Sequence, residues 1–211
     1  DHGDTYKEVL AGVEALGYDS SKIKVIIHQM VTFVQDGKPM KMSKRADNVY
    51  SLDELLDDVG VDVAQFFFVM RSANTHLEFD IELAKEQSDK NPVFYLQYAH
   101  ARICGILRNA VEALPEYKNI EKVNYDLLKS PEEISLMKIL SVFPEVVSAA
   151  SSALEPHKII TYLNEVAENY HKFYHNNRVI NLEDKDTSYA RLKLCEASKT
   201  VLKNGFEIIG I

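Results

Sequence analysis

The sequence predicts a mainly α-helical protein in which a short α/β segment precedes an all-helical bundle. Three observations indicate this fold. Residues 6–16 have a helical pattern and residues 24–33 form an apolar run, an order typical of α/β repeats. From about Glu82 onward, apolar residues recur at spacings of three and four, as on the buried face of a helix. Four such helical stretches joined by short loops make a bundle.

The first predicted elements are a helix and a strand. The helix covers residues 6–16, stops at Gly17 and carries its apolar side chains on one face: Val9, Leu10, Val13 and Leu16. The run from Lys24 to Phe33 is rich in Val and Ile, which suits a strand of a parallel sheet buried on both faces. We therefore expect the two elements to form half of a βαβ unit.

Two short helices and a loop are expected next. Ser51 and Glu54 have the spacing of a capping box, which predicts a helix over residues 53–59. A second helix is expected over 62–70, although the run Phe66–Val69 also fits a strand. Residues 72–80 are expected to form a loop.

The bundle is expected to begin with a long helix over 84–114, which Pro92 could break. After a connector over 117–128, the sequence Ser130-Pro131-Glu132-Glu133 combines an N-cap, a first-turn proline and a capping-box glutamate. These residues predict a second helix that runs to Leu154 and kinks at Pro144.

A third helix is predicted from Pro156 to Tyr174, followed by a loop over 181–186. Thr187 or Ser188 should cap the last helix, and Gly205 should end it, because these residue types are favoured at those positions.

Composition excludes several classes of protein. The chain has 211 residues, of which 46% are hydrophobic and 27% charged, as in ordinary globular proteins. No apolar run approaches the roughly 20 residues of a membrane span, and no secretory signal opens the chain, so we expect no membrane partner and a cytoplasmic location. Cys104 and Cys195 lie among apolar helix residues, so we expect two small buried hydrophobes and no disulfide or metal site.

Net charge also limits the function. The formal charge of −8 argues against a general basic nucleic-acid binder. It does not exclude specific RNA recognition, in which unpaired bases stack on aromatic side chains beside a few local cations. His157, His171 and His175 are not spaced as a ligand set, so structural roles are expected for them and no metal is assigned.

A basic loop over Lys41-Met42-Ser43-Lys44-Arg45 follows a turn at residues 36–39. Lys41 and Lys44, three residues apart on one loop, could hold a polyphosphate from both sides, and fixed cations stabilise the charge that builds up in phosphoryl or nucleotidyl transfer. The alternative is a solvated basic loop, which composition alone favours.

Tyr95, Tyr98 and Arg102 share a lateral face of the predicted long helix. At about 100° per residue they fall within roughly 60° of one another, to one side of the apolar stripe. Two rings and a guanidinium on one face could stack unpaired bases. The alternative is a helix shoulder that packs on a neighbouring helix, where tyrosine is common.

The string KMSKR at 41–45 resembles the second signature of class I aminoacyl-tRNA synthetases. The wider pattern from His28-Gln29-Met30-Val31 through Gly37 and the basic loop to Leu55-Leu56 is similar to arginyl-tRNA synthetases. The run from Asn91 to Ile103 (NPVFYLQYAHARI) resembles the start of that family's anticodon-binding domain. The resemblance covers nearly the whole chain, and the Asn91–Ile103 run is its most specific part.

The resemblance implies a fold and an activity. Residues 1–85 would be the tail of a Rossmann-type α/β catalytic domain with the KMSKR loop and a connecting region, and residues 86–211 an all-helical anticodon-binding domain. The whole enzyme would be an arginine–tRNA ligase that joins arginine to tRNA(Arg) with ATP and magnesium, through an arginyl-adenylate. A monomer is expected. The chain opens at Asp1 without a methionine and lacks the His-x-Gly-His signature, so we expect a C-terminal part that cannot charge tRNA alone.

The resemblance also assigns residues in the catalytic part. Lys41 and Lys44 would bind the ATP phosphates and stabilise the leaving pyrophosphate, while Ser43 shapes the loop and Met42 anchors it. Further ATP contacts are expected from four residues: Met30, Val31, Asp1 and His2. Met30 and Val31 could equally be plain core, and Asp1 and His2 a frayed terminus.

In the helical part, the resemblance places Tyr95, Tyr98 and Arg102 against the anticodon, and Tyr174 matches a further family tyrosine there. The chain departs from the family pattern at Asp47, where glycine is usual, and at Gln65, where arginine is common. It also ends without the family's proline-glutamate-methionine segment. Two other functions stay open: an RNA-binding module without the chemistry, and a helical scaffold without a ligand.

Overall fold

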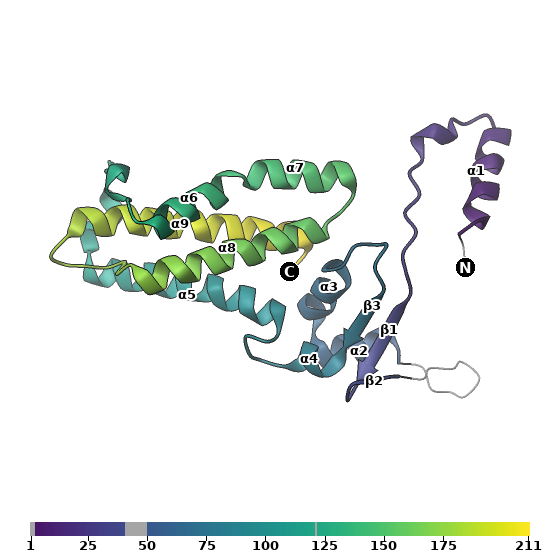
Figure 1. Cartoon of the computed structure of the whole chain (residues 1–211), viewed down its shortest axis with the longest axis horizontal. Coiled ribbons are helices and arrows are strands. Elements are labelled where there is room, and N and C mark those ends of the chain that lie inside the picture. Colours follow the sequence, from purple (N-terminus) through teal and green to yellow (C-terminus); the bar gives the residue numbers. More distant parts are fainter. Residues whose placement is uncertain (1–2, 41–49, 121) are drawn as a thin grey trace.

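The computed structural model describes residues 3–40, 50–120 and 122–211 of the chain. Figure 1 shows a long helical bundle, a small sheet with short helices beside it, and one helix that stands apart. The mainly helical fold with an all-helical bundle is therefore confirmed. The basic loop at 41–45 and the first two residues, Asp1 and His2, lie outside the described residues.

The first helix, α1 (Thr5–Ala15), forms where the sequence predicts it and is followed by the short 3₁₀ helix η1 (Ser20–Lys22). Its apolar face is largely uncovered: none of its residues is buried, Val9 is 66% exposed, and Leu16, just beyond its end, is 77% exposed. Figure 1 shows α1 apart from the sheet and the bundle, connected by an extended segment.

The first strand, β1 (Val31–Gln35), is shorter than predicted and begins later. Its parallel partner β3 (Leu77–Asp80) pairs with residues 31–34 alone, and its antiparallel partner β2 (Lys38–Pro39) pairs with residues 34–35. The prediction of a buried strand from residue 24 was wrong. Residues 24–30 lie before the sheet, with one backbone bond from Gln29 N–H to Ala73 C=O, and their apolar side chains are exposed.

Strand β3 lies within the segment that was expected to be a loop. Leu77 and Phe79 are buried while Glu78 is exposed, which is the alternation of a strand with one covered face. Two apolar residues in four give too short a signal to be seen without the partner strand. Asp80 then caps the short helix α4 (Ile81–Lys85) by accepting a hydrogen bond from Leu83 N–H at 3.0 Å.

The two short helices between β2 and β3 are α2 (Leu52–Val59) and α3 (Val61–Val69). The predicted capping box is present: Ser51 N–H donates to the Glu54 carboxylate at 2.7 Å, and Glu54 N–H donates to Ser51 Oγ at 3.2 Å. Phe66 and Phe67 are fully buried in α3, so the alternative of a strand at 66–69 was wrong.

The long helix predicted over 84–114 is broken before Pro92. Helix α5 (Pro92–Ala113) starts there because Asn91 caps it, accepting from Val93 N–H at 3.0 Å. The Asn91 amide also donates to the carbonyl oxygens of Ala84 and Glu86, at 3.0 and 2.9 Å. The side chain of Asn91 thereby fixes the segment that joins α4 to the bundle.

The second predicted helix is two helices, α6 (Pro131–Ser141) and α7 (Phe143–Ala153), after the 3₁₀ helices η3 (Pro115–Asn119) and η4 (Tyr125–Leu127). Pro144 lies in the first turn of α7, a position that tolerates proline, so it starts a new helix where a kink was expected. The Ser130–Glu133 capping box is confirmed.

Among the described residues, the stretch Pro131–Ala153 is long and apolar enough to cross a membrane by length and composition, although no such segment was expected. Such a match is weak by itself. This stretch changes direction at Val142, between α6 and α7, and both helices pack against α8. Leu136 and Ala150 are buried by this packing, while Val142 between the two helices is 41% exposed.

The last two helices are α8 (His157–Asn176) and α9 (Lys185–Ile209). Asp184 caps α9 by accepting from Thr187 N–H, so neither Thr187 nor Ser188 is the cap. Gly205 does not end the helix: α9 continues to Ile209, and its C-cap residue Gly210 has a left-handed φ of 80°. A Cβ atom on Gly205 would lie 2.4 Å from Leu163 Cδ2, so close packing of α8 on α9 explains this glycine.

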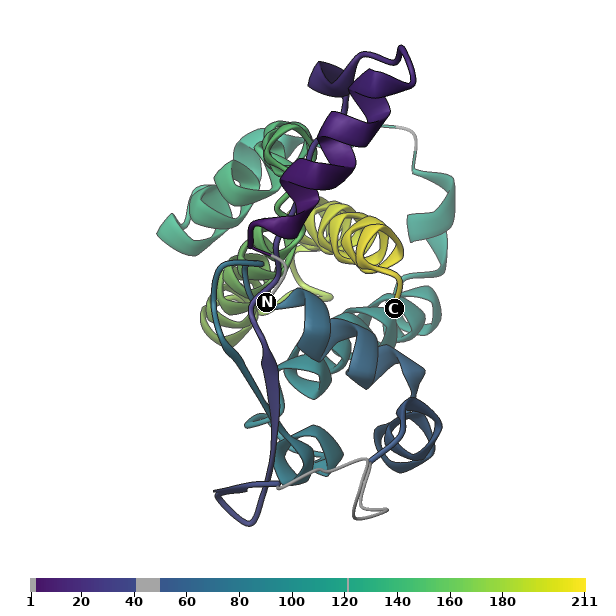
Figure 2. The ribbon, with the colours of Figure 1, turned by 90° about the vertical axis from the view of Figure 1, so that its right-hand side faces the viewer.

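The core of the bundle lies where α5, α8 and α9 meet, and Figure 2 shows these helices side by side. Their buried residues include Leu96, Ile103, Leu163, Ala167 and Leu202. Cys195 is buried as expected, whereas Cys104 is half-buried, and neither forms a disulfide. This core holds α5 against α8, so that side chains on their solvent-facing sides lie close together.

Candidate nucleic-acid interface

Three of the predicted RNA-binding residues meet between α5 and α8. Arg102 Nη2 donates to the Tyr98 hydroxyl at 2.7 Å, and the Arg102 Cζ atom lies 4.7 Å from the centre of the Tyr98 ring. The same Cζ atom lies 5.3 Å from the centre of the Tyr174 ring. Tyr98 and Tyr174 remain 47% and 39% exposed. A guanidinium is thus placed between two accessible aromatic rings.

Each of these tyrosines rests on another aromatic ring. Phe94, one turn before Tyr98, stacks on it with ring centres 6.4 Å apart and planes 7° apart. Tyr170, fully buried one turn before Tyr174, stacks on it at 6.3 Å and 16°. Residues four apart on a helix lie over one another, which explains both pairs. Each exposed ring is therefore backed by a second aromatic ring.

Tyr95 lies apart from this arrangement. It is half-buried, with its ring centre 5.3 Å from that of His171. Burial, with a smaller effect of the Glu168 carboxylate, raises the pKa of Tyr95 above its ordinary value. The Tyr95 ring thus packs between helices, as the helix-shoulder alternative expects, while Tyr98 and Arg102 face outward.

His171 on α8 contacts Arg102 directly. Its Nδ1 atom lies 3.4 Å from Arg102 Nη1. Because an arginine guanidinium has only donors, a hydrogen bond between these two nitrogens requires a neutral His171 with its proton on Nε2. Burial, together with the Arg102 charge, lowers the pKa of His171 below its ordinary value. Both causes favour the neutral acceptor.

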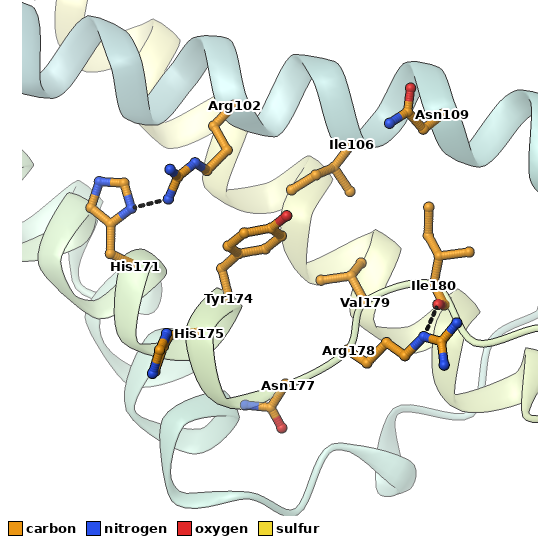
Figure 3. A pocket seen from close by; sticks show the side chains of 10 residues that line it. All are labelled: Arg102, Ile106, Asn109, His171, Tyr174, His175, Asn177, Arg178, Val179 and Ile180. Carbon is orange, nitrogen blue, oxygen red and sulfur yellow. Dashed lines mark hydrogen bonds between the residues drawn. The ribbon is translucent and has the colours of Figure 1, made fainter.

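A pocket of about 580 Å³ opens beside Arg102 and Tyr174. Figure 3 shows its lining, which comes from α5, α8 and the segment after α8: Arg102, Ile106, Asn109, His171, Tyr174, His175, Asn177, Arg178, Val179 and Ile180. None of these lining residues is acidic, although the chain carries a net charge of −8. The pocket therefore suits an electron-rich or anionic group.

Sequence reasoning missed part of this pocket. Asn109 lies seven residues after Arg102, two turns further along the same face of α5, so helical periodicity could have found it. Arg178 follows α8, and its Nε atom donates to Ile180 C=O at 3.0 Å. No periodic pattern reaches Arg178, because it stands in an irregular segment.

The predicted ATP-binding residues are only partly described. Lys41, Met42, Ser43 and Lys44, as well as Asp1 and His2, lie outside the described residues. Met30 is 74% exposed just before β1, so the core alternative for it was wrong. Val31 is half-buried and pairs with Leu77 in the sheet.

No set of three or more His, Cys, Asp or Glu side chains that could hold a metal ion occurs within residues 3–40, 50–120 and 122–211. Magnesium that accompanies ATP is usually held by the phosphates and one or two carboxylates, so its expected role here stays a prediction.

Comparisons with known proteins place the chain among related sequences. Residues 96–211 match the model of the DALR anticodon binding domain. Over its whole length the chain is 47% identical to arginine–tRNA ligases from Salinibacter ruber and Desulfotalea psychrophila, and it spans 37% and 38% of those proteins. The resemblance drawn from the sequence motifs is confirmed by these relatives.

Solved structures agree. The crystal structure of an arginyl-tRNA synthetase from Campylobacter jejuni matches with a TM-score of 0.85 and 32% identity, covering 100% of this chain and 45% of the other. Arginyl-tRNA synthetase from Thermus thermophilus matches 85% of this chain and 33% of its own, with a TM-score of 0.65 and 23% identity, which supports the fold alone.

Proposed function

This chain belongs to the family of DALR anticodon-binding domains, and we propose that the protein containing it is an arginine–tRNA ligase. In this proposal the protein uses ATP to activate arginine and transfers it to tRNA(Arg). Support comes from the 47% identity to arginine–tRNA ligases along the entire chain. Because the chain spans little more than a third of those relatives, its own contribution is a part of the reaction cycle.

The proposed contribution of the bundle is recognition of the anticodon. The observation that carries it is the guanidinium of Arg102 between the exposed rings of Tyr98 and Tyr174. An unpaired base can stack on such a ring, and each stack contributes about 1–3 kcal/mol. Arg102 has more N–H groups than its two bonds within the protein use, so it can also donate to a base edge or a phosphate.

The proposed contribution of the N-terminal part is the pyrophosphate clamp. A carboxylate oxygen of arginine attacks the α-phosphate of ATP, the bond to the β-phosphate oxygen breaks, and pyrophosphate leaves with the negative charge. Lys41 and Lys44 would stabilise that charge as it develops, which is the main way that such transfers are accelerated. The match of residues 41–45 to the KMSKR signature supports this assignment.

One kinetic comparison on the full-length protein tests the two contributions separately. We expect Lys44→Ala to slow pyrophosphate exchange by about 100-fold or more at saturating tRNA, because a fixed charge at the leaving group is removed. Affinity for tRNA should be unchanged. An exchange rate equal to that of the wild-type protein would remove Lys44 from the mechanism.

A substitution in the bundle should instead weaken tRNA binding and leave the exchange reaction intact. We expect Tyr98→Ala to raise the KM for tRNA(Arg) by roughly 5–150-fold, which corresponds to the loss of one stacked base. Exchange at saturating tRNA should be spared. Tyr125→Ala is the control, since Tyr125 is 56% exposed on η4 and lines no part of the pocket. Equal KM values for the two variants would argue against base stacking on Tyr98.

A further inference from the structure

The position of Arg102 depends on few partners. An arginine side chain has several rotatable bonds and loses about 2 kcal/mol of rotamer freedom when it is held in one place. Within the described parts of the chain, Arg102 belongs to none of the ion pairs with Asp or Glu. Its hydrogen bonds there go to the Tyr98 hydroxyl and to His171 Nδ1. His171 is therefore the one of these two acceptors that joins Arg102 to α8.

The charged and titratable groups around His171 come from three segments. From α5 these are Arg102 and the half-buried Tyr95. From α8 they are Glu168 and Lys172, which pair with each other at 2.6 Å, with Tyr170, Tyr174 and His175. The segment after α8 adds Arg178. Glu168 is paired with Lys172, whereas the Arg102 guanidinium contacts the His171 ring directly.

Protonation of His171 would reverse this contact. The lone pair on Nδ1 that accepts from Arg102 would be replaced by an N–H group, and two cations would then face each other at the 3.4 Å that separates the nitrogen atoms now. In a partly buried position such a pair repels strongly because little solvent screens it. Arg102 would have to leave its place between Tyr98 and Tyr174.

From this geometry we propose that neutral His171 is a positioning residue for RNA recognition, which holds the Arg102 guanidinium between the two tyrosine rings and releases it on protonation. The inference rests on the proposed anticodon recognition and adds a regulation to it. The expected pH dependence of RNA affinity is opposite to the usual one. Protonating a histidine near RNA ordinarily strengthens binding by adding a positive charge, whereas here acidification weakens it.

The test is the dissociation constant of the protein for tRNA(Arg), measured from about pH 8 to about pH 5.5. For the wild-type protein we expect the affinity to fall toward the acid end. His171→Gln keeps an oxygen that can accept from Arg102 and does not titrate, so it should bind within about 2-fold of wild type at the alkaline end and lose less affinity in acid. His171→Leu has no acceptor and should bind roughly 2–10-fold more weakly throughout.

His175→Gln is the matched control. His175 lines the same pocket and is exposed, but it makes no hydrogen bond to Arg102. Its substitution should leave the acid-side loss of affinity in place. Thermal unfolding of each variant shows whether it is folded at every pH used.

Two results would overturn the inference: a pH profile of His171→Gln that matches wild type, or full affinity of His171→Leu at the alkaline end. Neither result would contradict the proposed function. That proposal would fail on a different observation, namely equal affinity of the wild-type protein for tRNA(Arg) and for the same tRNA with an altered anticodon at about pH 8.

Discussion

Glu133 shows how a single residue can serve two structural roles. It is 1% exposed, and its two carboxylate oxygens are used differently. Oε2 accepts from the N–H groups of Lys129 and Ser130, both at 2.7 Å, while Oε1 accepts from Arg191 Nε at 2.7 Å. The residue thus closes the start of α6 and links it to α9. The capping box was predictable from a four-residue string, but Arg191, 58 residues away, was not.

The ionisation of Glu133 follows from these contacts. Burial alone would raise its pKa, but the hydrogen bonds from Ser130 and Arg191 outweigh burial and lower the pKa below its ordinary value of 4.5. A carboxyl with a lowered folded pKa adds stability above its unfolded pKa, and that stability is lost as the pH falls through the folded pKa.

We therefore predict that Glu133→Gln destabilises the protein by about 1.5–3 kcal/mol at about pH 7, because a charged hydrogen-bond partner of Arg191 is lost. The difference from wild type should shrink as the pH falls below 4.5 and through the lowered pKa of the folded carboxyl, where the wild-type carboxylate takes up its proton. Urea unfolding at about pH 7 and across this acid range measures the difference. Glu145→Gln, at an exposed position of α7, is the control and should change stability by less than about 0.5 kcal/mol. A difference that is independent of pH would contradict the account.

At the scale of elements, the crossing of α8 and α9 depends on a small residue. Gly205 lies inside α9, where glycine is unfavourable by about 1 kcal/mol relative to alanine. Leu163, fully buried on α8, fills the space that a side chain at 205 would need. Here helix packing overrides helix propensity.

Gly205→Ala should accordingly destabilise the protein by about 1–3 kcal/mol, since Leu163 must move to admit the methyl group. Gly105→Ala is a matched change in α5, where the nearest atom to the new Cβ is Arg108 Nη2 at 3.9 Å, and it should stabilise by about 0.5–1 kcal/mol. Denaturant midpoints of the two variants give the comparison. If both substitutions stabilise, close packing at Gly205 is not the reason for the glycine.

The helix starts with capping boxes were predictable from local sequence, whereas other starts, stops and strands were less so. The capping boxes that begin with Ser51 and Ser130 mark the starts of α2 and α6, and both form as expected. Gly205 is a residue type typical of a helix end, but α9 continues past it because the glycine serves the packing of α8 on α9. Pro144 starts a helix where a kink was expected. Strand β3 depends on its pairing with β1, which no local pattern in residues 77–80 expresses.

At the scale of the molecule, the two proposed contributions lie in different parts. Tyr98, Arg102 and Tyr174 lie on the bundle, whereas the elements that flank the basic loop, the sheet strand β2 and the helix α2, lie outside the bundle (Figure 1). Among the described side chains, Gln65 joins the parts, as its Nε2 donates to Ile209 C=O at 3.3 Å. The residue that departs from the family pattern therefore supports the arrangement of the two parts.

At this scale, the prediction that failed most clearly was the burial of the apolar residues in the N-terminal segment, which are exposed in the structure. The Val-Ile run at 24–30 and the face of α1 have the composition of core, and local sequence predicts burial for both. Whether such a face is covered depends on what else lies against it, which its own sequence does not express. The aromatic and guanidinium group on α5, by contrast, was predictable, because Tyr98 and Arg102 stand one turn apart on one helix.

The most direct test of the central claim is the ratio of affinities for tRNA(Arg) and for the same tRNA with its anticodon replaced, measured on the wild-type protein and on a Tyr98→Ala/Tyr174→Ala variant. The account predicts a preference of roughly 10-fold or more for the wild type, because each base contact contributes about 1–3 kcal/mol, and a ratio near one for the variant. A preference of the same size in both proteins would contradict it.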